Sequence, residues 1–117
     1  MSARAAPLAL APLLAILVLA VLALAPAGGA RAATVRVRIA GYAFVPARVH
    51  IHPGDTVVWT NRDPATHTVT ALAGGFDSGA LGPGRSYRRV FPAAGSFAYR
   101  CALHPEMRGV VIVGTPP

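Results

Sequence analysis

The chain has 117 residues, of which 54% are hydrophobic, and a formal net charge of +7. This length allows one domain, and the single cysteine excludes an internal disulfide. All eleven basic residues are arginines; because they are scattered and belong to no nucleic-acid-binding motif, we expect no nucleic-acid partner.

The N-terminal region has the features of an export signal. Arg4 precedes an apolar run over residues 8–25, and small residues follow that run. The run is close to the roughly 20 residues of a membrane-spanning helix, so a retained anchor is the alternative to a cleaved signal peptide. We therefore predict that residues 1–33 are a signal peptide or membrane anchor. Residues 34–117 are then an exported domain, periplasmic or extracellular.

From residue 34 onward the sequence predicts short β-strands separated by turns that contain glycine or proline. Residues 35–39 alternate strictly between apolar and arginine side chains, as a strand with one solvated face does. Further strands are expected over residues 49–52, 56–60, 66–70, 86–91, 96–101 and 109–113. No helical periodicity follows the N-terminal segment, so the pattern indicates an all-β fold, either a sandwich or a barrel.

The predicted core is small. An exported domain of about 85 residues buries only a little over 60% of its unfolded surface, and metal ligation is one way to add folding free energy. The expected core residues are the hydrophobic residues of the strands, namely Val57, Trp59, Val69, Phe97, Tyr99 and Val111, with Phe44 and Phe91 as further candidates.

One short loop carries three potential metal ligands. Cys101, His104 and Met107 follow one another at intervals of three residues, so a thiolate, an imidazole and a thioether can point at one centre. Thiolate and thioether are soft ligands, and one cysteine, two histidines and a weak axial methionine form the ligand set of an electron-transfer copper site. The loop supplies three of these four ligands.

Three other histidines could supply the fourth ligand. His50 and His52 share one face of a predicted strand; we interpret them as solvated strand positions, because two histidines alone make a weak metal site. His67 follows a proline-containing loop and could meet the cysteine loop at one end of a sandwich. The alternative is a hydrogen-bonded loop histidine, and the residue pattern alone leaves both interpretations open.

Five motifs occur in order along the predicted domain: PGDTVVW at residues 53–59, HTV at 67–69, FDSG at 76–79, GSFAYRC at 95–101 and HPEMRG at 104–109. In this order they resemble the cupredoxins, or type I blue copper proteins, and in particular their plastocyanin-like and amicyanin-like members. The resemblance implies a cupredoxin-like Greek-key β-sandwich preceded by the N-terminal hydrophobic segment.

The resemblance also implies one type I copper ion, held by His67, Cys101 and His104 as equatorial ligands and by Met107 as the axial ligand. A gap-filling core methionine is the alternative for Met107. Cupredoxins often have an asparagine after the first ligand histidine, where it braces the two ligand loops. This chain has Thr68 there, whose hydroxyl can also donate and accept hydrogen bonds.

We therefore expect an exported electron carrier that shuttles single electrons between redox partners, and not an enzyme. The sequence has no Ser-His-Asp arrangement, and a four-ligand site leaves no strong position for a reactant. An exported protein that stores or delivers copper is the first alternative, although Met1 and Met107 are the only methionines. A metal-free structural domain is the second, and the complete ligand set argues against it.

The loop around His104 is short and apolar, so we expect it to dock redox proteins weakly and transiently. Arg100 and Arg108 flank the loop and could attract a partner with an acidic docking surface, or could be solvated strand charges. We expect a monomer that contacts a membrane only if the N-terminal segment is retained.

Overall fold

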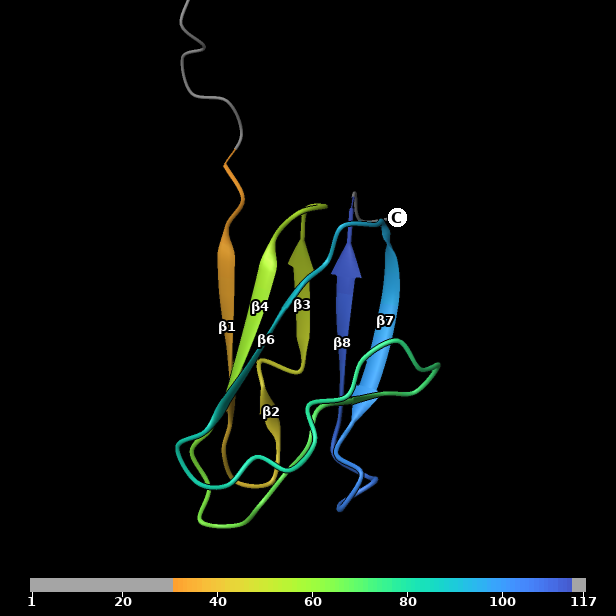
Figure 1. Cartoon of the computed structure of the whole chain (residues 1–117). Helices are drawn as coiled ribbons and strands as arrows, with labels where there is room; N and C mark the ends of the chain where they lie inside the picture. The colour runs from red at the N-terminus through yellow and green to blue at the C-terminus, as the bar shows by residue number, and fades with distance from the viewer. Residues whose placement is uncertain (1–30, 115–117) are drawn as a thin grey trace, which may run out of the picture. The chain divides into compact units, whose positions relative to one another are not determined.

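The computed structural model describes residues 31–114, so almost all of the predicted signal or anchor lies outside the described residues. Within this range the secondary structure consists of strands and turns, arranged in two four-stranded sheets (Figure 1). No helix in this part of the chain is long and apolar enough to cross a membrane. The predicted all-β sandwich is confirmed.

Each sheet draws its strands from both halves of the described chain. The first sheet has the order β2 (Phe44–Val45), β1 (Thr34–Ile39), β4 (Thr56–Asn61) and β6 (Ser86–Val90). The second has the order β3 (Arg48–Ile51), β8 (Arg108–Val113), β7 (Gly95–Arg100) and β5 (Thr70–Ala71). β1 pairs in parallel with β4, and β3 pairs in parallel with β8, whereas the other pairs are antiparallel.

The core lies between the two sheets and follows from the alternation of each strand. In β4 the buried residues Val57 and Trp59 flank the half-buried Val58, because successive side chains point to opposite faces. Seven of the eight predicted core residues are buried. Phe97 is the exception: it is only partly buried and packs against the edge of the core.

Two aromatic residues connect the sheets. The rings of Trp59 in β4 and Tyr99 in β7 pack edge to face, with their centroids 5.4 Å apart. Tyr99 is fully buried, and this burial raises the pKa of its hydroxyl to about 12. In the β7–β8 ladder Tyr99 lies opposite Gly109, where a Cβ atom would stand 2.4 Å from the tyrosine ring. Only glycine fits this position without displacing the ring.

The strand expected over residues 66–70 is wrong for most of its length, since regular pairing begins only at Thr70. The backbone N–H groups before it have other partners. Thr68 N donates to the Sγ of Cys101, and Val69 N donates to the Oγ of Ser78. His67 makes only an isolated bridge with Leu81. The β-branched sequence favoured a strand, but Cys101 and Ser78 accept the hydrogen bonds that strand pairing would need.

Candidate metal centre

Three connections meet at one end of the sandwich, which lies at the bottom of Figure 1. They are the turn between β1 and β2, the loop after β4, and the loop between β7 and β8. The fully buried Asn61, the last residue of β4, organises the second of them. Its Nδ2 donates to the carbonyl groups of Ala65 and Leu81, both at 2.8 Å, and its Oδ1 accepts from Asp63 N at 2.9 Å. These bonds fix the loop that leads to His67.

The structure brings His67, Cys101 and His104 together. The Nδ1 atom of His67 lies 3.7 Å from the Sγ of Cys101, and the Nδ1 of His104 lies 3.6 Å from the same sulfur. One potential ligand atom from each of the three residues lies within 4.8 Å of the other two. Residues 34 positions apart therefore converge on one centre, as the site hypothesis requires.

These distances fit a shared metal ion. A first-row ion bonded at about 2.3 Å to sulfur and about 2.05 Å to nitrogen, with about 115° between the bonds, places the two donor atoms about 3.7 Å apart. A thiolate and two imidazoles form a donor set that suits copper. Cys101 and His67 are fully buried, so water has little access to them.

Met107 closes the loop that carries the other ligands. Its N–H donates to the carbonyl of His104 at 2.9 Å, and its carbonyl accepts from Cys101 N at 3.1 Å. The residue is buried. These two backbone bonds hold the Cys101–Met107 segment as a compact turn, in which the spacing between the three loop residues is fixed.

Asp63 orients the imidazole of His67. The Nε2 of His67 lies 2.9 Å from the Oδ2 of Asp63. Backbone N–H groups of Tyr42 and Gly41, and the imidazole of His67, hold the pKa of this carboxyl below its usual value, against the opposing effect of burial. Because the carboxylate can only accept, Nε2 must carry the proton. A neutral His67 then presents its Nδ1 lone pair on the side of Cys101.

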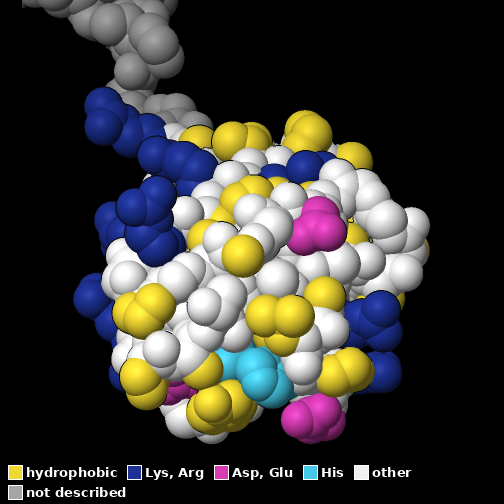
Figure 2. Space-filling view, turned by 60° about the horizontal axis from the view of Figure 1, so that its bottom comes forward, with side chains coloured by type: hydrophobic (Ala, Val, Ile, Leu, Met, Phe, Trp, Pro, Cys, Tyr) yellow, Lys and Arg dark blue, Asp and Glu magenta, His cyan; other side chains and the backbone are white. Residues whose placement is uncertain are grey.

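The surface at this end is apolar around a partly exposed histidine. His104 is half-buried, and Leu103 beside it is 56% exposed. Tyr42, from the β1–β2 turn, is 51% exposed, and its ring packs edge-on against both His67 and His104. Figure 2, which brings this end forward, shows histidine at the surface among hydrophobic side chains. His104 is therefore the ligand candidate nearest to an approaching protein.

The two remaining histidines, His50 and His52, lie away from this centre. His50 is exposed on β3, and His52 just beyond it has a side chain that is 90% exposed. In the described part of the chain, neither belongs to a group of three or more potential metal ligands. Asp55 and Asp77 accept hydrogen bonds from backbone N–H groups of their own turns, which is a usual role of aspartate in turns.

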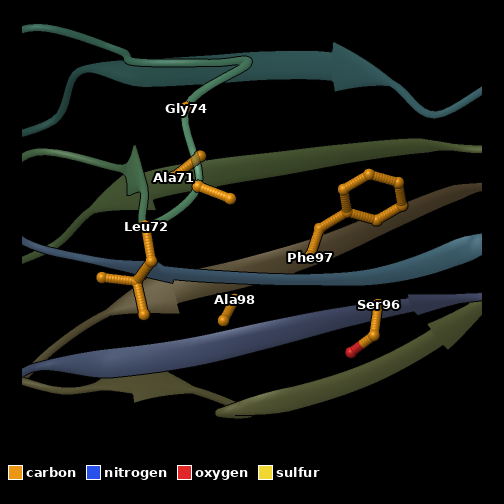
Figure 3. Close-up of a pocket in the computed structure, with 7 residues that line it drawn as sticks. Ala71, Leu72, Gly74, Ser96, Phe97 and Ala98 are labelled. Atoms are coloured by element: carbon orange, nitrogen blue, oxygen red, sulfur yellow. The ribbon is translucent and has the colours of Figure 1, made fainter.

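A separate cavity of about 150 Å³ lies between residues 71–74 and residues 96–98 (Figure 3). The side chains that line it are apolar apart from the hydroxyl of Ser96. It therefore offers neither a carboxylate nor an imidazole for acid–base chemistry, and it does not include any of the candidate ligands.

Sequence reasoning missed three residues that support this site, namely Asn61, Asp63 and Tyr42. Asp63 precedes His67 by four residues in a proline-containing loop, and this closeness of a carboxylate to a histidine was the available signal. Tyr42 gave no comparable signal, because it reaches the histidines only through the turn between β1 and β2.

Comparison with known proteins identifies relatives of this chain. The sequence matches the cupredoxin-like domain family over residues 13–113. It is 39% identical to amicyanin from Paracoccus denitrificans over 82 residues, which cover 66% of this chain and 63% of the relative. It is 36% identical to amicyanin-alpha from Methylorubrum extorquens over 94 residues, which cover 76% of this chain and 75% of the relative. The match thus spans less than two thirds of the Paracoccus protein.

A solved structure supports the same relationship. A reduced amicyanin with a tryptophan-to-tyrosine substitution superposes with a TM-score of 0.66 at 29% sequence identity. The superposition covers 69% of this chain and 82% of that one.

Proposed function

This chain belongs to the cupredoxin-like family, and from that premise we propose that it is an exported, non-enzymatic carrier of single electrons. Its metal centre would be one type I copper ion bound by His67, Cys101, His104 and Met107. The observation that carries the proposal is the convergence of both Nδ1 atoms on the Sγ of Cys101, at 3.7 and 3.6 Å.

When bound, copper supplies a one-electron redox couple. The protein's contribution is a site that needs little rearrangement. The backbone N–H of Thr68 donates to the Sγ of Cys101 at 3.3 Å, which orients the sulfur and stabilises its negative charge. Hydrogen bonds of Asn61 and Asp63 hold the loop that carries His67 in place. With Cys101 and His67 buried, little water has to reorganise around the site.

The electron would enter and leave near His104. This residue is half-buried beside the exposed apolar side chains of Tyr42 and Leu103, and Glu106 of the same loop adds one exposed carboxylate. Such a surface suits a small, transient interface with a redox protein. Arg100 and Arg108 lie directly opposite each other at the base of the loop, and their charges favour a partner with an acidic rim.

The experiment is to load the purified protein with Cu(II) and record its visible absorption and its reduction by a small-molecule donor. A type I site gives an intense band in the red from thiolate-to-Cu(II) charge transfer, and this band disappears on reduction and returns on reoxidation without loss of metal. A protein that binds copper but is colourless, or that releases the ion on reduction, would favour copper storage or delivery and contradict the carrier function.

A further inference from the structure

The carboxylate of Asp63 links His67 to the turn between β1 and β2. The side chain of Asp63 accepts hydrogen bonds from Gly41 N at 2.7 Å and Tyr42 N at 2.8 Å. It also lies 2.9 Å from the Nε2 of His67. Asp63 is buried; its contact with His67 is shielded from water, and its two bonds to the turn are partly buried. The positions of the β1–β2 turn and of the His67 imidazole are therefore set by the same side chain.

Tyr42 adopts a backbone conformation that non-glycine residues seldom adopt. Its φ is 57°, in the left-handed region. Burial does not explain the conformation, because the side chain is 51% exposed. Strain of this kind persists where the surroundings hold it in place, and here the Asp63 carboxylate holds the N–H groups of Gly41 and Tyr42.

The strained conformation places the Tyr42 ring against both histidines. The ring centroid lies 5.0 Å from that of His67, with an interplanar angle of 90°, and 4.9 Å from that of His104, with an angle of 85°. The two imidazole centroids are themselves 5.0 Å apart. Edge-to-face contacts of this kind have a preferred geometry, so the tyrosine limits the rotation of both rings.

We propose that Asp63 and Tyr42 form a positioning unit that sets the orientation of both histidines before the metal binds. Asp63 holds the Nε2 proton of His67 and so directs Nδ1 toward Cys101. Tyr42, held in its strained conformation by the same carboxylate, packs against His67 and His104 and keeps His104 facing the sulfur. Neither residue is a ligand in this account; both act through the histidines. The inference rests on the proposed copper site.

The test for Tyr42 uses the exported protein, purified as its host produces it. Tyr42→Gly removes the ring and relieves the left-handed strain, so the unfolding midpoint of the metal-free variant should equal or exceed that of the wild type. Transfer of copper from the variant to a competing chelator should nevertheless accelerate roughly 3- to 10-fold, as expected for the loss of aromatic pairs. Tyr42→Phe keeps the ring and should behave as the wild type. Equal transfer rates for Tyr42→Gly and the wild type, or acceleration that merely follows a loss of stability, would overturn the role of Tyr42.

The test for Asp63 measures the tautomer of His67 directly. In the metal-free wild type, ¹⁵N NMR should show a proton on the Nε2 of His67. Asp63→Asn should populate the other tautomer and lower copper affinity by about 10- to 100-fold. Asp55→Asn is the matched control, because Asp55 is also a buried carboxylate with two backbone donors, Ala33 N and His52 N, but contacts no candidate ligand. An unchanged tautomer and affinity in Asp63→Asn would overturn the role of Asp63.

The wild-type spectrum separates the two hypotheses. If the copper-loaded wild type lacks the charge-transfer band, the proposed function fails. If the band is present but Tyr42→Gly and Asp63→Asn leave transfer rate, tautomer and affinity unchanged, the positioning unit alone fails.

Discussion

The hydroxyl of Thr68 accepts a hydrogen bond from the backbone N–H of Ala102 at 2.7 Å, across a separation of 34 residues. The N–H of Thr68 donates to the Sγ of Cys101 in the same place. Threonine thus braces the two ligand loops at the position where cupredoxins often have asparagine. A second contact, 2.8 Å from the Thr68 hydroxyl to that of Thr70, holds the side chain in this orientation.

Thr68→Val should therefore destabilise the protein. Valine keeps the shape but removes the partly buried hydrogen bond from the N–H of Ala102, and loss of such a bond costs about 0.5–1.5 kcal/mol. Thr68→Ser retains the hydroxyl and is the control. Denaturant unfolding of the metal-free proteins measures the difference; equal stability of the valine and serine variants would show that the hydroxyl does not brace the loops.

Gly109→Ala should destabilise the protein, because the structure has no space for the added Cβ atom. The added Cβ would lie 2.4 Å from the buried ring of Tyr99, and overpacking of this kind costs about 1–3 kcal/mol or more. Gly82→Ala provides the comparison, because its Cβ would meet nothing closer than Arg85 Cγ at 4.0 Å and should change stability by less than about 0.5 kcal/mol. Thermal unfolding distinguishes the two. A Gly109→Ala variant as stable as Gly82→Ala would mean that Tyr99 is not held as described.

The lowered pKa of the Asp55 carboxyl predicts how the stability of the protein changes in acid. Hydrogen bonds from Ala33 N and His52 N lower the pKa of its carboxyl from the ordinary value of 3.8. A carboxyl whose pKa is lower in the folded state stabilises the fold above the unfolded-state pKa, and this contribution is lost as the pH falls through the folded-state value. The stability difference between the wild type and Asp55→Asn should hence be constant near neutral pH and shrink below pH 3.8. Urea unfolding over that range is the measurement, and a difference that persists undiminished into strong acid would refute it.

Arg100 and Arg108 should control association more than stability. They are direct cross-strand partners, and like charges in that position destabilise a sheet slightly. Arg108→Gln removes this repulsion together with the exposed hydrogen bond from Arg108 Nε to the Pro105 carbonyl, so stability should change little. The substitution should slow electron exchange with an acidic partner, and added salt should slow the wild type more than the variant. Arg36→Gln, which removes an equal charge from the exposed face of β1, is the control. Stopped-flow rates that do not depend on salt would remove steering from the account.

Most of the strands could be predicted because their signal is local. Residues 35–39 alternate within themselves, and the structure assigns a strand to Thr34–Ile39. The segment at residues 66–70 misled because its β-branched residues favour a strand, while Thr68 N and Val69 N donate to the side chains of Cys101 and Ser78 and not to a neighbouring strand. Phe97 lies on β7 with the expected alternation and packs against the core, but it is only partly buried.

The residues of the metal centre also differ in how far the sequence alone could predict them. Cys101, His104 and Met107 share one loop, so their spacing alone suggests a common centre. His67 comes from another connection, and the residue pattern by itself left its role open until the family resemblance was considered. The contacts of Asp63 with Gly41 and Tyr42 depend on how the β1–β2 turn folds over the loop after β4. No local pattern encodes such a contact.

The central claim, that imidazole and thiolate groups converge on one copper ion, is tested most directly by the visible spectrum of the Cu(II)-loaded protein and of its Cys101→Ser variant. The account predicts an intense red-region band in the wild type and none in the variant, because a serine hydroxyl cannot supply the sulfur-to-copper transition. A wild type without the band, or a variant that retains it, would contradict the account.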